Sequence, residues 1–293
     1  MTVKGRKGLK AFILIIAGIV LLMTLEIVRE THSFRVIRYA VSAPCKMKIV
    51  FLSDLHNQCY GEKNQKLLAA IEREKPDMIL IGGDMLVGKN GYDSVVAEEF
   101  VEALSHFCPV YYANGNHEQR MKETPEKYDL SYLAYKEKLE KAGIQFLENS
   151  SVSITSGQAK MRITALEIPR YCYKRLGKGK LRQEDMEERI GKADSSCFQI
   201  LLAHNPCYMD EYVEWGADLV LSGHLHGGIV RIPGLSGVIA PDLQLFPRYS
   251  GGYYTKGKTQ IVVSKGLGMH TIPIRLFNPA EVVVLELAGR RLE

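Results

Sequence analysis

The first half of the chain alternates short apolar runs with longer amphipathic segments. Residues 48–53, 78–81 and 110–112 have the length and the β-branched or aromatic content of buried strands. The segments between them, 64–75 and 94–106, are predicted to be helical. This β-α-β-α-β order predicts a largely parallel sheet with helices packed on it. In α/β sheets of this kind, ligands collect at the carboxyl ends of the strands.

The second half mixes further helices and strands with a Gly- and Pro-rich region. Residues 229–252 are expected to form hairpins and loops. No repeat or low-complexity tract divides residues 45–293, and 293 residues are enough for one large α/β domain with a full core. The other expected elements are helices at 131–142, 181–190 and 207–215, and strands at 145–147, 152–154, 161–165, 198–202, 218–221, 260–264 and 282–287.

Polar blocks follow the ends of predicted strands at five places. Five of the eight histidines fall inside these blocks, whereas chance would spread them along the chain. Carboxylate and imidazole ligands suit borderline divalent metals such as Mn, Fe, Co or Zn, and an all-oxygen site would favour Mg or Ca. The sequence therefore predicts a transition-metal site. The blocks are Asp54-Leu55-His56, Gly82-Gly83-Asp84, Gly115-Asn116-His117-Glu118, Ala203-His204-Asn205 and Gly223-His224-Leu225-His226-Gly227.

The blocks differ in how specific each one is by itself. A surface loop or turn would explain Asp54 with His56, or Asp84 after two glycines, equally well. His224 and His226 are more specific, because alternate residues of an extended segment flanked by glycines present both imidazoles to one place. The carboxylate of Asp84 has two oxygens and can bridge two metals. Accident does not explain all five blocks together.

The order of the blocks resembles the signature of the calcineurin-like metallophosphoesterase superfamily. It runs Asp-x-His, Gly-Gly-Asp, Gly-Asn-His-Glu, a lone His and Gly-His-x-His, and it spans about residues 48–228. With its apolar N-terminus, the chain is similar to the small bacterial membrane-anchored members. The resemblance implies an α/β fold, namely a four-layer α/β/β/α metallophosphatase-type sandwich with an N-terminal transmembrane helix.

The resemblance also implies two divalent metal ions (Mn, Fe or Zn) that share one carboxylate. Two ions about 3.5 to 4 Å apart bind a bridging hydroxide and phosphoryl oxygens, which provides a nucleophile at neutral pH. His117 is expected to contact the phosphoryl group, beside Asn116, and to protonate the leaving oxygen as a catalytic residue. Alternatively, His117 only orients a ligand. The first ion is expected to bind Asp54, His56, Asp84 and His226, and the second Asp84, Asn116, His204 and His224.

The N-terminal region predicts a membrane anchor. Residues 11–25 carry no charge, and with their apolar flanks they approach the roughly 20 residues that cross a bilayer. A cleaved signal peptide is the competing interpretation, but no small-x-small site closes the apolar core. We therefore expect a basic tail at 1–10, a transmembrane signal anchor at 11–28, a connecting segment at 29–44 and a metallophosphoesterase domain at 45–293.

The distribution of charge predicts the orientation of the anchor and argues against one class of partner. The formal net charge is +5, and the four basic residues of the tail account for all but +1 of it. This favours a cytoplasmic N-terminus and an extracytoplasmic catalytic domain at the cell membrane. A nearly neutral body argues against nucleic acid as a partner. One local basic cluster is either a solvated loop or a contact for an anionic substrate or lipid head group: Arg170, Lys174, Arg175, Lys178, Lys180 and Arg182.

The remaining cysteines and histidines suggest no second site. The six cysteines form no CxxC pair and are expected to be mostly free thiols. His32 and His106 are expected to be structural, and His270, just past a predicted strand, is a minor candidate for the cleft.

The leading hypothesis is a dimetal phosphoesterase that hydrolyses a phosphomonoester, a phosphodiester or a pyrophosphate. A domain facing outward would meet cell-envelope or lipid-linked phosphates. A domain facing inward would suit a nucleotide-linked lipid, as in related hydrolases that cleave the pyrophosphate of UDP-diacylglucosamine. The alternative from another class is a non-catalytic metal-binding scaffold, which has no use for seven converging ligands. A nuclease would need the basic cluster to line the cleft.

Overall fold

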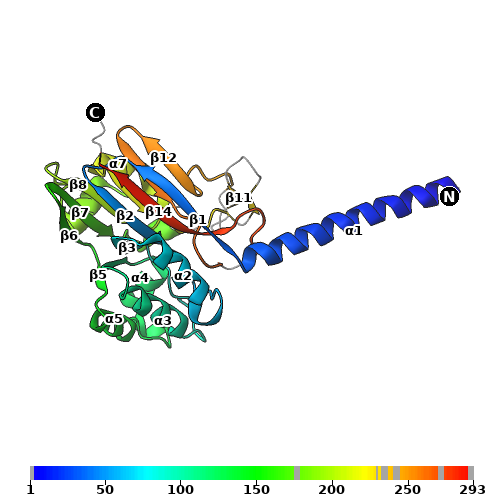
Figure 1. Ribbon diagram of the computed structural model, residues 1–293, viewed down its shortest axis with the longest axis horizontal. Helices are drawn as coiled ribbons and strands as arrows, with labels where there is room; N and C mark the ends of the chain where they lie inside the picture. The colour runs from blue at the N-terminus through cyan, green and yellow to red at the C-terminus, as the bar shows by residue number, and fades with distance from the viewer. Residues whose placement is uncertain are drawn as a thin grey trace.

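Two six-stranded sheets stack face to face, and helices cover both outer faces (Figure 1). The computed structural model describes residues 3–174, 179–228, 230–231, 237–239, 245–269 and 274–289. This is the four-layer α/β/β/α sandwich that the resemblance implies, so the predicted fold class is confirmed. The sheets run in the orders β1-β14-β2-β3-β4-β5 and β12-β13-β9-β8-β7-β6.

The first sheet is parallel except where β14 meets β2. Its outer face is covered by four helices, α2 to α5, through one continuous apolar cluster. The strands are β1 (Phe34–Val41), β14 (Ala280–Ala288), β2 (Lys46–Leu52), β3 (Met78–Ile81), β4 (Val110–Ala113) and β5 (Gln145–Leu147). The helices are α2 (Gln65–Glu74), α3 (Val95–Leu104), α4 (Asn116–Glu123) and α5 (Tyr132–Lys141).

The second sheet has a parallel centre and an antiparallel hairpin at each side. Helices α6 (Gln183–Ile190) and α7 (Met209–Trp215) pack on its outer face. The strands are β12 (Gly252–Lys256), β13 (Thr259–Val263), β9 (Leu219–Ser222), β8 (Phe198–Ala203), β7 (Ala159–Leu166) and β6 (Ser150–Ser156). Shorter elements are the pair β10 (Val230–Arg231) and β11 (Gly237–Ile239), and the 3₁₀ turns η1 (Glu62–Asn64), η2 (Pro125–Lys127), η3 (Arg170–Tyr173) and η4 (Pro206–Tyr208).

The strand β2 shows why the sequence of a central strand is apolar without interruption. Ile49 and Phe51 face the other sheet, whereas Val50 and Leu52 face the helices, and all four side chains are fully buried. A strand that is covered on both faces has no polar side, which is the pattern of buried parallel sheets. Each such side chain stabilises the fold by about 1.5–3 kcal/mol. The carboxyl end of β2 is thereby fixed where Asp54 follows.

Two elements near the site lie where the sequence did not predict them. Strand β1 lies in the stretch 29–44 that was expected only to connect, and it pairs in parallel with β14. Its run is interrupted by Arg35 and Arg38, so only pairing with the far end of the chain makes it a strand. Helix α4 begins at Asn116, and its sequence NHEQRMKE has no apolar stripe from which helical spacing could be recognised.

The N-terminal helix α1 (Val3–Thr31) projects away from the body of the molecule (Figure 1). Within its segment Phe12–Thr31, a stretch of 18 residues has a mean hydropathy of 2.4, and none of that stretch is buried against the rest of the chain. Length and composition fit a membrane span, and a signal sequence near an N-terminus meets the same description. The helix extends beyond the 11–28 expected for the anchor at both ends.

Candidate metal centre

The polar blocks of both sheets meet at one edge of the sandwich. The loops that follow β2, β3 and β4 lie together because these strands are parallel neighbours. The loops after β8 and β9 reach the same place from the second sheet. The backbone N–H of His224 donates to Asp54 Oδ1 over 3.1 Å, and His204 Nδ1 lies 2.7 Å from the carbonyl oxygen of Gly82. Residues 170 positions apart in sequence are therefore neighbours.

One group of potential ligands consists of Asp54, His56 and His226. One ligand atom from each lies within 4.8 Å of the other two, and all three residues are buried. His226 Nε2 is 3.3 Å from Asp54 Oδ1, and the rings of His56 and His226 stack with centroids 5.1 Å apart. Three converging donors of this kind can hold a divalent cation.

A second group consists of Asp84, His204 and His224, with the same mutual spacing. His204 Nε2 lies 3.1 Å from Asp84 Oδ2. The same carboxylate oxygen is 3.8 Å from His56 Nε2, so Asp84 lies between the two groups. This is the position that a bridging carboxylate needs.

Asn116 supplies a neutral oxygen at the start of α4. Its side chain is buried, and its Oδ1 accepts no hydrogen bond within the part of the chain that the structure describes. Leaving a buried acceptor without a donor costs about 1–3 kcal/mol, which a bound cation would offset. The next residue, His117, donates its backbone N–H to Asp84 Oδ1 over 2.8 Å, which brings Asn116 to the centre. The Asn116 Oδ1 atom is therefore suited to bind a cation.

Three histidines each have a hydrogen bond of the same kind, from a ring nitrogen to a backbone carbonyl oxygen, and this bond fixes their tautomer. The Nδ1 atoms of His56, His204 and His226 lie 3.2, 2.7 and 3.2 Å from backbone carbonyl oxygens. A carbonyl oxygen only accepts, so we assign the proton of each neutral ring to Nδ1. The Nε2 lone pair then points into the centre, as in rings that ligate a metal.

His117 has the opposite arrangement. The backbone N–H of Gly88 donates to its Nδ1 over 2.7 Å, so the proton of the neutral ring is assigned to Nε2. This Nε2 lies 3.9 Å from Asp84 Oδ2. His117 therefore faces the centre with a donor, whereas the three rings above face it with an acceptor. The hydrogen-bond partner of Nδ1 therefore distinguishes a donor ring from possible ligand rings, which the residue type alone does not.

The backbone around the centre is strained. Five of the residues expected as ligands have φ in the left-handed region, between 45° and 69°. Such conformations cost of order 1–3 kcal/mol each and cluster at functional sites. Two glycines are required here, because a Cβ at Gly83 would clash with the backbone of Gly115, and a Cβ at Gly115 would clash with the carboxylate of Asp84. The five are Asp54, His56, Asp84, His224 and His226.

The electrostatics of the centre favour positive charge. Burial raises the pKa of Asp54 to about 6. Burial also acts to raise the pKa of Asp84, but the imidazoles of His204 and His117 outweigh it and hold that pKa well below its usual range. Burial lowers the pKa of His204, yet the carboxylates of Asp84 and Asp54 raise it to about 10. Two buried carboxylates thus create a potential that retains a proton or a cation.

Glu118, which stood in a block without an expected role, orders the loops. It is fully buried and accepts the backbone N–H groups of Asp84, Leu86 and Gly115 over 2.9 to 3.1 Å. Burial and the nearby Asp84 charge raise the pKa of Glu118 to about 7. The sequence signal was its place three residues after Gly115, where a helix N3 glutamate reaches back to the N-cap.

Arg275 and Asn278 were not singled out from the sequence, and they hold the loop of His226. Arg275 is 3% exposed and donates to the carbonyl oxygens of Lys265, Gly266, Gly268 and Asn278. Asn278 donates to the carbonyl oxygens of His226 and Gly228 over 2.6 Å. No sequence signal marked either residue, because their partners are backbone atoms of distant segments.

Some of the other expected candidates lie outside the described residues, and the basic cluster begins beside the centre, where the ring of Tyr173 packs edge to face on His224 with centroids 5.3 Å apart. His270, Arg175 and Lys178 belong to the residues that the structure does not describe. In the rest of the basic cluster, Arg182 pairs with Asp185 over 2.9 Å, and Arg170 Nε lies 3.7 Å from Glu123. The six cysteines are free, as expected.

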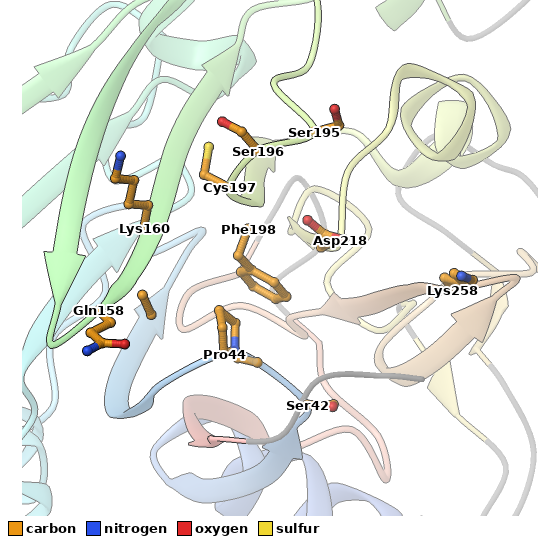
Figure 2. A pocket seen from close by; sticks show the side chains of 12 residues that line it. Ser42, Pro44, Gln158, Lys160, Ser195, Ser196, Cys197, Phe198, Asp218 and Lys258 are labelled. Atoms are coloured by element: carbon orange, nitrogen blue, oxygen red, sulfur yellow. The ribbon is translucent and has the colours of Figure 1, made fainter.

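A cavity of about 590 Å³ opens at the opposite edge of the sandwich (Figure 2). It lies at the amino ends of β7, β8 and β9, beside Phe198, Lys160 and Asp218. None of the clustered carboxylates and histidines lines it. We assign the chemistry to the metal-ligand cluster, because converging ligand atoms, rather than empty volume, make a reactive site.

The comparisons with known proteins agree with this fold and cluster. The family model for the calcineurin-like phosphoesterase matches residues 47–228, which is more than half of the chain. YpbG of Bacillus subtilis is 28% identical over 268 residues, 89% of this chain and 87% of that protein. A metallophosphoesterase of Aquifex aeolicus is 29% identical, covering 89% and 94%. The phosphodiesterase YaeI of Escherichia coli is 27% identical, covering 82% of each.

The chain belongs to the calcineurin-like phosphoesterase family. It is a metal-dependent hydrolase of phosphoric esters, and the family implies divalent metal ions, for which the structure has suitable His and Asp groups.

Proposed function

We propose that the cluster holds two divalent ions that share Asp84. The position of this carboxylate carries the proposal: it shares one group of ligand atoms with His204 and His224 and another with His56 and His117, and His56 also belongs to the group of Asp54 and His226. The buried acceptor of Asn116 supports it, since this oxygen gains from a nearby cation, and the buried carboxylates of Asp54 and Asp84 supply negative charge that a cation would neutralise. The first ion would bind Asp54, His56, Asp84 and His226, and the second Asp84, Asn116, His204 and His224.

The mixed nitrogen and oxygen donors suit Mn, Fe or Zn better than Mg or Ca. When bound, such a pair of ions polarises a phosphoryl group and lowers the pKa of a water molecule, which supplies the nucleophile of a hydrolase. Residues around the centre fix the positions of the proposed ligands. Glu118 and the close approach of Gly83 and Gly115 hold Asp84 in place. The three carbonyl-bonded histidines cannot rotate without losing a hydrogen bond.

His117 has a different role in this proposal. Its Nε2–H faces the centre beside Asp84, so it would donate to an oxygen of the phosphoryl group or to the leaving oxygen. Because the Gly88 N–H occupies Nδ1, the ring acts as a neutral donor rather than as a ligand. Negative charge that develops on the phosphoryl oxygens would strengthen this hydrogen bond.

We infer that the substrate is a phosphodiester or related phosphoester of the cell envelope, and that α1 keeps the enzyme at the membrane. The relative YaeI, named a phosphodiesterase, supports the ester class. The apolar, unburied α1 supports the anchor, and the basic residues before it support a cytoplasmic N-terminus with the catalytic domain outside.

The test is hydrolysis of bis(p-nitrophenyl) phosphate and of p-nitrophenyl phosphate by the full chain in detergent, with Mn added or chelated. We expect metal-dependent turnover, a bound-metal content near two ions per chain, and a preference for the diester. A folded chain that binds two ions but hydrolyses neither ester would favour the binding scaffold. A chain that binds no metal would refute the proposed ligands.

A further inference from the structure

The edge of the sandwich that carries the metal-ligand cluster is also the edge from which α1 leaves the body (Figure 1). Phe34, the first residue of β1, pairs with Ala280 at the start of β14, and β14 runs antiparallel beside the end of β2. We propose that this edge lies against the lipid bilayer, so that the enzyme takes its phosphoester from the headgroup layer. The inference rests on the proposed anchor and the proposed hydrolytic centre.

The connection between α1 and the body is short, and polar contacts of its flanking residues hold it in place. Only two residues separate the end of α1 from β1. Ser33 Oγ donates to the carbonyl oxygen of Arg29 over 2.7 Å. The side chain of Glu30 is 1% exposed, and its Oε1 lies 3.7 Å from the guanidinium of Arg35. A membrane that contains α1 must therefore lie close to the edge where β1 begins.

Few contacts separate the base of the anchor from the cluster. The ring of Phe34 packs edge to face on Tyr60, with centroids 5.1 Å apart. The hydroxyl of Tyr60 donates to the carbonyl oxygen of Leu267. The next carbonyl oxygen, that of Gly268, bonds to His226 Nδ1. The cluster thus lies at the membrane side of the sandwich and not at its far end.

Exposed apolar side chains gather in two loops at this edge. Eight large apolar side chains outside α1 are exposed among the described residues, and four of them lie in segments 245–246 and 274–277. A soluble surface gains nothing from such groups, whereas the interfacial region of a bilayer accommodates them. Their exposed fractions are 63% for Leu245, 62% for Phe246, 38% for Ile274 and 46% for Phe277.

Both loops are tied to the backbone around His226. Arg275 bonds to the Gly268 carbonyl, and Asn278 bonds to the carbonyl of His226 itself. The loop of Phe246 runs on to Ser250, whose hydroxyl accepts the N–H of Gly237 over 3.0 Å, and a Cβ at Gly237 would clash with the Gly227 carbonyl.

The two phenylalanines are held in an unfavourable conformation. Phe246 has φ of 47° and Phe277 has φ of 53°, in the left-handed region that bulky residues rarely adopt. Neither ring is buried in the protein, so packing within the chain does not explain the strain. Insertion into the bilayer interface would compensate it, since aromatic rings are favoured at that depth.

Fluorescence quenching tests the docking without reference to activity. The single tryptophan, Trp215, is replaced by Phe, and Phe246→Trp or Phe277→Trp is introduced in the full chain. Gln158→Trp, exposed at the opposite edge, is the matched control. In phosphatidylcholine–phosphatidylglycerol vesicles with brominated acyl chains, we expect positions 246 and 277 to lose emission and position 158 to keep it. Retention in the vesicles without quenching at 246 and 277 would overturn the docking. Absence from the vesicle fraction would overturn both the anchor and the docking.

Turnover tests the consequence for the substrate. The water-soluble diester is compared with the p-nitrophenyl ester of phosphatidic acid in the same vesicles, where water attacks phosphorus, the bond to p-nitrophenolate breaks, and phosphatidate remains. We expect the double variant Phe246→Ser, Phe277→Ser to lose about tenfold on the vesicle ester and less than about twofold on the soluble one. Leu133→Ser, an equally exposed residue on α5, should match the wild type.

The two proposals fail in different ways. Equal losses on both esters, or no loss on either, would overturn the docking while leaving the hydrolytic centre intact. A wild-type chain that hydrolyses neither ester would refute the proposed function, and the quenching would still decide the docking.

Discussion

The two edges of the sandwich differ in what the strands deliver to them. At the carboxyl ends, five loops bury carboxylates and imidazoles with their ligand atoms facing one another. At the amino ends, a cavity of about 590 Å³ is lined by scattered side chains such as Lys160, Ser196 and Lys258. In this fold, therefore, the convergence of ligand atoms, and not the volume of a cavity, marks the reactive site. Changes at the first edge should therefore alter turnover or metal binding, and changes at the second edge should not.

The largest effect is expected from Asp84→Asn. Loss of the shared carboxylate removes charge from both proposed metal sites at once, so turnover should fall by about a thousandfold or more, with loss of bound metal. Metal content by mass spectrometry and hydrolysis of the chromogenic diester check this. The matched control is Asp218→Asn at the opposite edge, where the side chain accepts the N–H of Gln199 and an amide oxygen can still accept it. Equal loss in both variants would break the comparison.

A smaller effect is expected from His117→Ala. The variant should keep both metals, because this ring faces the centre with a donor, and kcat should fall about a hundredfold. Parallel measurement of metal content and kcat separates the two outcomes. Loss of metal would show that His117 is a ligand and that the assigned tautomer is wrong.

The affinity for metal should depend on pH, because the metal-free cluster holds a proton that a metal ion must displace. The pKa of His204 is raised to about 10 by the two carboxylates, so the metal-free ring carries a proton at neutral pH. A metal ion must displace that proton, and the apparent affinity should therefore rise with pH, by up to about tenfold per unit below pH 10. Titration with Mn at pH 6, 7 and 8 checks this, with parallel measurement of proton release. An affinity that does not change with pH would contradict it.

The same raised pKa predicts a trend in the stability of the metal-free chain. Because the folded value lies above the ordinary value of about 6.5, His204 adds stability that is complete below pH 6.5 and is lost as pH rises towards 10. Unfolding by urea at pH 6 and pH 9 measures it. Chain loaded with metal should not show this loss.

The smallest effect is expected at the opposite edge. The double variant Lys160→Ala, Lys258→Ala should change turnover less than about twofold and stability by less than about 0.5 kcal/mol, as for ordinary surface positions. A clear change in turnover would show that residues of the cavity affect catalysis at the metal-ligand cluster.

The sequence predicted most strands and helices of the body because they carry their own pattern. The run 78–81 coincides with β3, since a strand buried on both faces is apolar without a break. Strand β1 was missed because its two arginines hide the pattern, and α4 because its buried first turn is polar. Both are elements that only a distant partner stabilises.

The sequence alone was enough to predict the class of fold and the residues that could hold a metal, and the order of its motifs resembled the family. These predictions rest on side-chain type and on position after a strand, which are local properties. The tertiary structure decided which donors share a group, which histidines face the centre with a lone pair, and that Arg275 and Glu118 hold the loops. It also decided that α1 leaves the body at the edge of the cluster. These properties depend on strand register and on hydrogen bonds to the backbone of remote segments, and no local pattern encodes them.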